Sequence, residues 1–308
     1  MLPGIQMTKS KAILLLLRLP FLTVSIGAVL LGTAFAWWQT RKFEPVLFVL
    51  ALVGACAFHI ACNVANDYFD FKSGNDASNR SGLVPFSGGS QMVLNGFVKP
   101  GEALSISILF AIFGSAIGLY LNAVSRENLI LFIGIAALFF IYNYNGFPLK
   151  LVNKGLGEVA IFMAWGPLMV FGAYYVQAGR LPSFWALAVT FPSGILTTLV
   201  LLINEFADKE ADLQTGRKTW VILYGYKKSL LVYLALALSC YLIVLSGVLF
   251  GGWPLWSLLV LVTLPLPFMA YSAGLRNMGD WPRFLPAVKN TIFMNFAFLV
   301  ILSIGFVI

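Results

Sequence analysis

Residues 45–76, PVLFVLALVGACAFHIACNVANDYFDFKSGND, combine a long apolar run with a cluster of acidic residues. Residues 45–66 contain no Asp, Glu, Lys or Arg, and about 20 apolar residues in a helix are enough to cross the hydrocarbon core of a bilayer. Asp67, Asp70 and Asp76 follow directly. The stretch therefore predicts a membrane-spanning helix that carries carboxylates at one end.

Similar apolar runs continue through the whole chain of 308 residues. Hydrophobic residues make up 60% of it and charged residues 10%, whereas a soluble domain carries about 25% charged residues. The runs predict nine transmembrane helices, at residues 12–37, 45–66, 103–124, 128–146, 155–178, 183–204, 227–250, 253–273 and 286–307. Because the longest stretch between them is 67–102, we expect an all-α polytopic membrane protein with a single domain over residues 1–308.

Seven of the 12 acidic residues lie in two short segments, at the ends of the second and sixth predicted spans. The first segment covers residues 63–76, and the second, NEFADKEADLQTGRK, covers residues 204–218. If each span continues as a helix, spacings of three and four residues place the polar side chains of each segment on one face. That face carries Asn63, Asn66, Asp67 and Asp70 in the first segment, and Asn204, Asp208 and Asp212 in the second.

Stacked carboxylates near a membrane repel one another and are costly to desolvate, so we expect a cation beside them. Mg²⁺ suits such a site because it binds through one or two carboxylates and keeps its other positions for water and substrate phosphate. Two acidic segments that face each other would hold metal ions around one diphosphate. Basic residues beside them would neutralise the same diphosphate, namely Lys72, Arg80, Lys150, Arg217 and Lys218.

Two other interpretations of the acidic segments are open on the residues alone. They are solvated loops that cap helices, or ion sites of a secondary transporter or channel. Transport sites place acids near the bilayer midplane, whereas these acids lie at span ends beside basic residues, which favours an enzyme. His59 is the only histidine, so a metal site built on several histidines is excluded, and a packed, hydrogen-bonded role is expected for it.

Basic residues are unevenly distributed between the two sides of the predicted bundle. The N-terminal tail and the loops after even-numbered spans hold 15 of the 20 Lys and Arg residues, and the opposite loops hold four. Basic loops face the cytoplasm, so we expect the N-terminus and both acidic segments on the cytoplasmic side of the cell's inner (plasma) membrane. The net charge of +8 then reflects topology, and no nucleic-acid partner is needed to explain it.

The two acidic segments resemble the paired motifs of UbiA-type intramembrane prenyltransferases. Residues 66–70, NDYFD, with Gly74 and Asp76, resemble the first aspartate motif of that family, and residues 204–219 resemble the second. YNYNGFPLKLVNKGLGE (142–158), WGPL (165–168) and RLP (18–20) are similar to the menaquinone branch, in which the acceptor is 1,4-dihydroxy-2-naphthoate. The resemblance covers residues 18–230 by motif and the remainder by the number of spans.

The resemblance implies nine helices around a central cavity, with both motifs at its cytoplasmic end. Family members use Mg²⁺ to join an isoprenoid diphosphate to an aromatic or other lipophilic acceptor. Carried over by motif, the metal ligands would be Asp67, Asp70, Asp76, Asp208 and Asp212. The catalytic residues would be Asp67, Asp70, Asp208, Asp212 and Lys150. Substrate binding would involve Asn63, Asn66, Arg80, Tyr144, Asn204, Arg217 and Lys218.

Three features depart from the family pattern. Asp76 follows Asp70 by six residues instead of the four usual in many members, and Tyr144 and Lys150 do not reproduce the usual spacing. SGLVPFSGGSQ (81–91) replaces a basic loop. The longer first motif, with GLGE and WGPL, favours 1,4-dihydroxy-2-naphthoate as the acceptor. The alternatives are 4-hydroxybenzoate, homogentisate, a chlorophyll precursor, a glycerol-phosphate ether lipid, and prenyl-lipid binding without catalysis.

Overall fold

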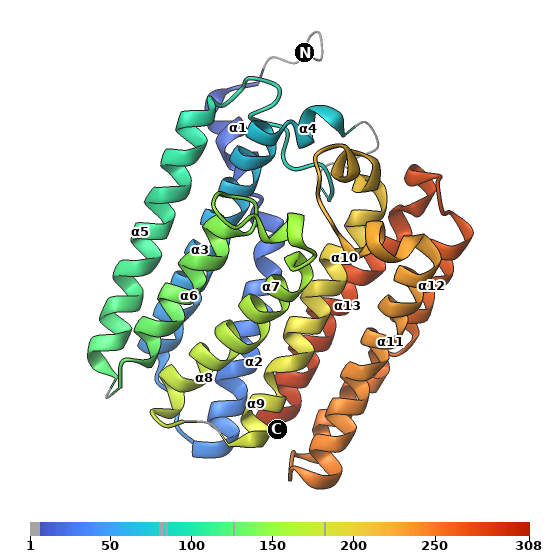
Figure 1. Cartoon of the computed structure of the whole chain (residues 1–308). Coiled ribbons are helices and arrows are strands. Elements are labelled where there is room, and N and C mark those ends of the chain that lie inside the picture. Colours follow the sequence, from blue (N-terminus) through green and yellow to red (C-terminus); the bar gives the residue numbers. More distant parts are fainter. Residues whose placement is uncertain (1–6, 80–82, 84–85, 126, 182) are drawn as a thin grey trace.

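The computed structural model describes residues 7–79, 83, 86–125, 127–181 and 183–308, which form a bundle of helices (Figure 1). The first half comprises α1 (Lys9–Leu16), the 3₁₀ turn η1 (Leu19–Leu22), α2 (Thr23–Thr40), α3 (Pro45–Ser73), α4 (Asn75–Ser78), α5 (Pro100–Val124) and α6 (Leu129–Asn143). The second half comprises the 3₁₀ turn η2 (Leu151–Lys154), α7 (Gly157–Met163), the π-helical turn η3 (Ala164–Leu168), α8 (Met169–Ala178), α9 (Phe184–Ala188), α10 (Thr190–Gln214), α11 (Trp220–Phe250), the 3₁₀ helix η4 (Leu255–Thr263), α12 (Pro265–Arg276) and α13 (Trp281–Val307). Within the described ranges there is no strand, so the predicted all-α fold is confirmed.

The predicted spans correspond to helical segments along the whole described chain. Eight of these segments are long and apolar enough to cross a membrane, and α6, at 15 residues, is a shorter apolar helix at the predicted fourth span. α3 continues to Ser73 and α10 to Gln214, beyond the predicted span ends at 66 and 204. Both acidic segments are therefore helical, as their spacing indicates. α1 and the end of α13 lie at opposite ends of the bundle (Figure 1).

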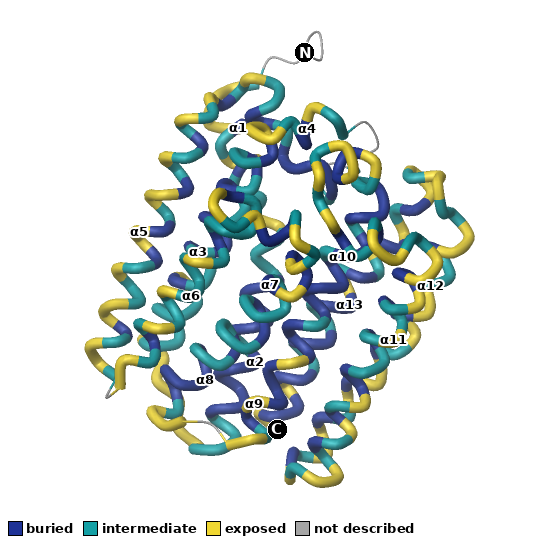
Figure 2. The backbone as a smooth tube through the Cα atoms, in the orientation of Figure 1, coloured by how far each residue is buried: buried dark blue, intermediate teal, exposed yellow. Residues whose placement is uncertain are grey.

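Burial differs strongly between the helices, and α10 lies at the centre. In its most apolar window, the segment Phe184–Gln214 is 72% buried, whereas the corresponding window of α5 is 28% buried. Exposed residues follow the outer face of α5 and α11 (Figure 2), and on α5 they are large and apolar, including Leu109 and Ile112. Such a surface suits lipid and not water.

The first predicted span, residues 12–37, is not one continuous helix. Arg18 adopts a left-handed conformation with φ 51°, and η1 follows it before α2 begins at Thr23. Pro20 contributes to the break, because proline has no backbone N–H to continue the helix and its ring crowds the carbonyl group four residues earlier. The break separates α1 from α2 and places the Arg18 side chain against the central cavity.

Two glycines allow α10 to approach α7 and the turn η3 closely. A Cβ atom on Gly166 would lie 2.9 Å from the Cα of Gly194, and a Cβ atom on Gly194 would lie 2.6 Å from the carbonyl oxygen of Phe162. In membranes the hydrophobic effect does not drive helices together, so helix association depends on van der Waals packing. Small residues at helix contacts allow this close packing. Pro167 lies inside the same π-helical turn, where its missing N–H is tolerated more easily than in a regular helix.

The close contact at Gly194 predicts that Gly194→Ala destabilises the bundle. The added methyl group would overpack the contact with Phe162, at a cost of about 1–3 kcal/mol in unfolding free energy, which exceeds the gain in helix propensity. Thermal unfolding in detergent measures this as a lower melting temperature. Gly101→Ala is the matched control, because nothing lies within 4 Å of a Cβ atom there. Equal melting temperatures for the two variants would contradict the packing described here.

Candidate active site

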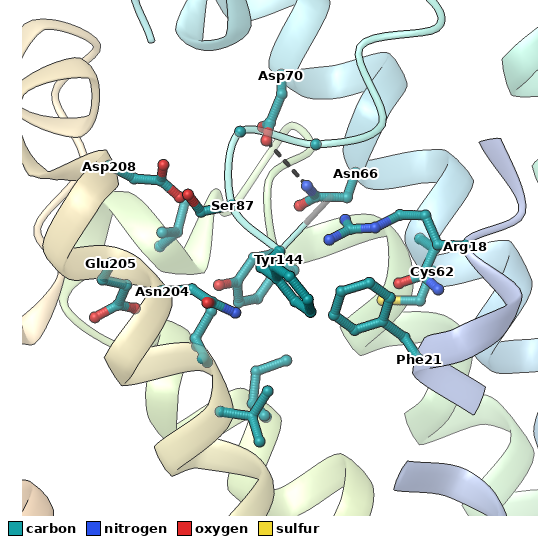
Figure 3. A pocket seen from close by; sticks show the side chains of 18 of the residues that line it. Arg18, Phe21, Cys62, Asn66, Asp70, Ser87, Tyr144, Asn204, Glu205 and Asp208 are labelled. Atoms are coloured by element: carbon teal, nitrogen blue, oxygen red, sulfur yellow. Dashed lines mark hydrogen bonds between the residues drawn. The ribbon is translucent and has the colours of Figure 1, made fainter. Parts of the chain in front are cut away.

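A cavity of about 180 Å³ lies where the acidic ends of α3 and α10 face each other. Its walls come from α3, α10, η1, the loop at residues 86–89 and the segment after α6. Figure 3 shows Asn66 and Asp70 on one side of this cavity and Asn204, Glu205 and Asp208 on the other, with Tyr144 between them. The two acidic segments, which are more than 120 residues apart in sequence, thus share one site.

The first acidic cluster depends on a reversal of the chain at Gly74. Gly74 ends α3 in a left-handed conformation, φ 76°, which glycine adopts without strain. The turn leads directly into α4, which packs against both α3 and α10 and brings Asp76 back toward Asp67. Both carboxylates border Gly89: a Cβ atom there would lie 3.1 Å from Oδ1 of Asp67 and 3.3 Å from Oδ1 of Asp76. The longer spacing of this motif is thus accommodated by α4.

Two asparagines hold the second acidic cluster in place: Asn75, the first residue of α4, and Asn79, which directly follows α4. Asn75 donates a hydrogen bond from Nδ2 to Oδ1 of Asp212 at 2.9 Å, and Asn79 donates one from Nδ2 to Oδ1 of Asp208 at 2.6 Å. Because α4 directly follows the first cluster, these bonds connect the two clusters. Asn145 plays the same part for the first cluster, with its Nδ2 donating to Oδ1 of Asp70 at 2.8 Å.

Arg217 joins the two clusters by charge. Its guanidinium contacts the carboxylate of Asp70 and lies 3.1 Å from that of Asp212, and its side chain is only 13% exposed. Burial acts to lower the pKa of Arg217, but the Asp70 and Asp212 carboxylates outweigh it and hold that pKa above its usual range. Arg217 therefore faces more than one buried carboxylate. Arg18 also lines the cavity, but the carboxylates of the two clusters still outnumber these two cations.

The excess charge is most evident at Asp76. Burial, together with the nearby charges of Asp70 and Asp67, raises the pKa of Asp76 to about 9. Neither carboxylate oxygen of Asp76 has a hydrogen-bond partner among the described residues, although both are buried. Asp67, by contrast, accepts a hydrogen bond from the backbone N–H of Ser90 at 3.1 Å and another from the Ser90 hydroxyl. A bound cation would supply the missing partner for Asp76.

The carboxylates are arranged in pairs that could each bind one Mg²⁺, and they do not provide a complete set of protein ligands for an ion. Within the part of the chain that the structure describes, no group of three or more Asp, Glu, His or Cys residues is arranged to hold one ion. Mg²⁺ requires only one or two carboxylates when substrate phosphate and water complete its shell. Asp67 and Asp76 around Gly89 form one such pair, and Asp208 and Asp212, one helical turn apart on α10, form another.

The structure brings most of the predicted site residues to the cavity. The predicted residues that line it are Asn63, Asn66, Asp70, Tyr144, Asn204, Asp208, Asp212 and Arg217, and Asp67 and Asp76 lie directly behind it. Lys150 and Lys218 are exposed, and neither is among the residues that line the cavity. Both lie in the irregular segments around η2 and before α11, whose course the sequence does not specify. Arg80 lies outside the described residues.

Several residues that the sequence analysis did not assign hold the site together, among them Asn75, Asn79, Ser90 and Asn145. They are Asn and Ser residues in the loops and at the short helix α4, where these residue types are common for local reasons, so their sequence context carries no distinctive signal. At the deeper end, Ser25 bonds Nδ1 of His59 at 2.7 Å and accepts a hydrogen bond from Nε1 of Trp165 at 3.1 Å. This confirms that His59 is packed and hydrogen-bonded.

Residues 25–299 of the chain match the UbiA prenyltransferase family. Two similar relatives are both 1,4-dihydroxy-2-naphthoate octaprenyltransferases. The enzyme of Bacillus subtilis (strain 168) is 31% identical over 93% of this chain and 89% of its own. The enzyme of Escherichia coli (strain K12) is 29% identical over 96% of each chain.

Solved structures share the fold at lower sequence identity. A UbiA homologue from Aeropyrum pernix K1 has a TM-score of 0.68 at 17% identity, over 93% of this chain and 96% of its own. A UbiA homologue from Archaeoglobus fulgidus, bound to DMAPP and Mg²⁺, has a TM-score of 0.61 at 17% identity, over 93% and 98%. With the family match over nearly the whole chain, the fold and the paired acidic motifs lead to one conclusion: this multi-pass membrane protein belongs to the UbiA prenyltransferase family and is a prenyltransferase.

Proposed function

We propose that the enzyme transfers a polyprenyl chain from a prenyl diphosphate to 1,4-dihydroxy-2-naphthoate, with Mg²⁺, on the cytoplasmic side of the plasma membrane. The observation that carries the proposal is the meeting of two acidic clusters and Arg217 at a cavity whose lining also includes aromatic and aliphatic side chains. The named activity of the relatives and the GLGE and WGPL segments support this acceptor. The transporter alternative is abandoned, because the chain belongs to an enzyme family.

The polar end of the cavity is suited to a diphosphate. Mg²⁺ held by Asp67 with Asp76, and by Asp208 with Asp212, would supply the positive charge that stabilises the departing diphosphate. Arg217 lies between Asp70 and Asp212, and its planar guanidinium is suited to phosphate oxygens as well as to carboxylates. Asp70 holds this arginine in position together with Asp212.

The apolar part of the cavity is suited to the reacting carbon. Cleavage of the allylic C–O bond leaves a carbocation that water would capture, so water must be kept out of the site. Phe21, Phe86 and Trp165 line the cavity beside aliphatic residues. Aromatic faces stabilise a desolvated cation by about 2 kcal/mol, so these rings would both exclude water and support the charge until a ring carbon of the acceptor attacks.

Two amide groups at the cavity wall are suited to the acceptor. Nδ2 of Asn63 on α3 and Oδ1 of Asn204 on α10 are buried, and neither has a hydrogen-bond partner among the described residues. Buried polar groups are normally paired, so a ligand is expected to pair them. An acceptor with hydroxyl and carboxylate groups offers both a donor for Asn204 and an acceptor for Asn63.

Removing a carboxylate from either pair should abolish turnover. Asp67→Ala and Asp208→Ala are each expected to lower kcat by about 100-fold or more, as the loss of a charge-stabilising group does in other enzymes, while the protein still extracts as a folded membrane protein. The assay measures labelled product at saturating Mg²⁺. Glu102→Gln is the control, because Glu102 pairs with Lys9 at an exposed site remote from both clusters. Activity at the wild-type level in Asp67→Ala or Asp208→Ala would remove that residue from the proposed metal site.

Removing Arg217 should make the stability of the protein depend on Mg²⁺. Arg217→Gln leaves Asp70 and Asp212 without their cation, and the loss of one partner from a buried pair costs about 3–5 kcal/mol. We expect a lower melting temperature in EDTA, and a larger increase on adding Mg²⁺ than in the wild type, because ion binding stabilises the folded state. Arg283→Gln, at an exposed surface pair with Asp280, should behave like the wild type. The same Mg²⁺ response in all three proteins would contradict the role of Arg217.

The acceptor is tested with purified protein, Mg²⁺, a radiolabelled prenyl diphosphate and a panel of aromatic acceptors. Product with 1,4-dihydroxy-2-naphthoate that is lost in EDTA is the expected result. Product with 4-hydroxybenzoate or homogentisate instead would keep the reaction class and overturn the proposed acceptor. No product with any acceptor, from folded protein, would overturn the proposed reaction.

A further inference from the structure

Two further cavities lie beyond the active-site cavity, and both are apolar. The nearer one, of about 50 Å³, shares His59, Cys62, Tyr144, Ile161 and Trp165 with the active site. The farther one, of about 120 Å³, shares Phe58, Ala137, Ala164 and Met169 with the nearer one. Because each cavity shares wall residues with the next, the three lie in series. We call the two apolar cavities the inner channel.

The order of lining residues along the helices gives the direction of this series. On α3, the lining residues pass from Asn66 at the active site through Phe58 to Ala51 at the far end. On α6 and the residue after it, they pass from Tyr144 through Ala137 to Ile130. Fifteen residues of α3 correspond to roughly 22 Å at 1.5 Å per residue. The inner channel therefore runs away from the carboxylates along the length of the bundle.

Glycines line the far end of the inner channel, and they are of two kinds. Gly54 and Gly114 have a packing role: a Cβ atom on Gly54 would lie 3.2 Å from Ile117, and one on Gly114 would lie 3.2 Å from Phe58. Gly118 on α5 and Gly134 on α6 have no such role, because nothing lies within 4 Å of a Cβ atom at either position. Glycine inside a helix costs about 1 kcal/mol relative to alanine. These two glycines thus keep space open without improving helix packing.

We propose that the inner channel holds the distal isoprene units of the prenyl diphosphate, and that Gly118 and Gly134 set the chain length that it admits. The proposal rests on the proposed function, which places the diphosphate at the carboxylates. Every residue that lines the farther cavity is apolar, as a hydrocarbon chain requires. The shared wall residues place the inner channel directly beside the active-site cavity, on the side toward which the tail of a donor bound at the carboxylates would extend.

The position of Gly134 gives the length at which the effect should begin. Ten residues separate it from Tyr144 at the active site, which corresponds to roughly 15 Å. An extended chain advances about 1.2 Å per bond, and each isoprene unit adds four bonds along the chain. The third isoprene unit is therefore expected beside Gly134. A donor with two units should not reach this position, whereas one with four units must pass it.

The experiment compares geranyl and geranylgeranyl diphosphate as donors for Gly118→Leu, Gly134→Leu and the wild type. We expect each leucine to lower kcat/KM for geranylgeranyl diphosphate by about tenfold or more, because displacing even one methylene from a fitted pocket has effects of that size. The value for geranyl diphosphate should be unchanged. Leucine is a better helix former than glycine, and both sites have room for a Cβ atom, so melting temperatures should not fall.

Ala116→Leu is the matched control, because Ala116 is an exposed residue on the same helix as Gly118 and should not affect either donor. An equal loss with both donors, or no change with either, would overturn the inner channel as the site of the tail. Binding of the two labelled donors without acceptor provides the same comparison in the absence of turnover. If the wild type forms no product, but Gly134→Leu still binds the longer donor less well than the wild type does, the result would contradict the proposed reaction and support the channel.

Discussion

The electrostatic balance between two buried acidic clusters and one arginine is the constraint on which the rest of the structure depends. Asp70 at the end of α3 and Asp212 at the end of α10 both contact Arg217, and Asn75 and Asn79, which follow α3 in the chain, bond to carboxylates of α10. Carboxylates withdrawn from water are costly unless they are paired and hydrogen-bonded. The ends of α3 and α10 therefore lie together around Arg217 and the asparagines that pair with their carboxylates, and the site forms between these two helix ends.

The carboxylates of the two clusters have too few positively charged partners among the described residues, and this excess of negative charge indicates a function. Arg217 supplies one positive charge, while Asp76 remains buried among carboxylates with neither of its oxygens hydrogen-bonded to a described residue. A purely structural cluster would be expected to satisfy its own members. An excess of negative charge beside a cavity instead favours a site completed by Mg²⁺ and diphosphate, whose charges balance those of the protein.

Glycines have two different roles in the interior: some allow close helix contacts, and others line a cavity. Gly166 and Gly194 bring η3 and α10 together, and this contact supports the wall from which Trp165 reaches the cavity. Gly118 and Gly134 make no such contact, because nothing lies within 4 Å of a Cβ atom at either position, and they leave space open instead. Polarity changes along the resulting path, from carboxylates and amides at one end to hydrocarbon at the other. A prenyl diphosphate has the same gradient.

The sequence by itself determined the fold class, the nine predicted spans and the two acidic clusters, because membrane insertion and helical spacing are local properties. Tertiary structure alone decided which partners surround those clusters. Asn75, Asn79, Ser90 and Asn145 reach the carboxylates from loops and from the short helix α4. Lys150 and Lys218 lie at the surface, although their charges favoured a place in the site. The inner channel is likewise a property of packing, whereas the break at Arg18 reflects the local effect of Pro20. The contacts across a helical bundle join residues that are far apart in sequence. The local spacing of residues therefore does not predict them.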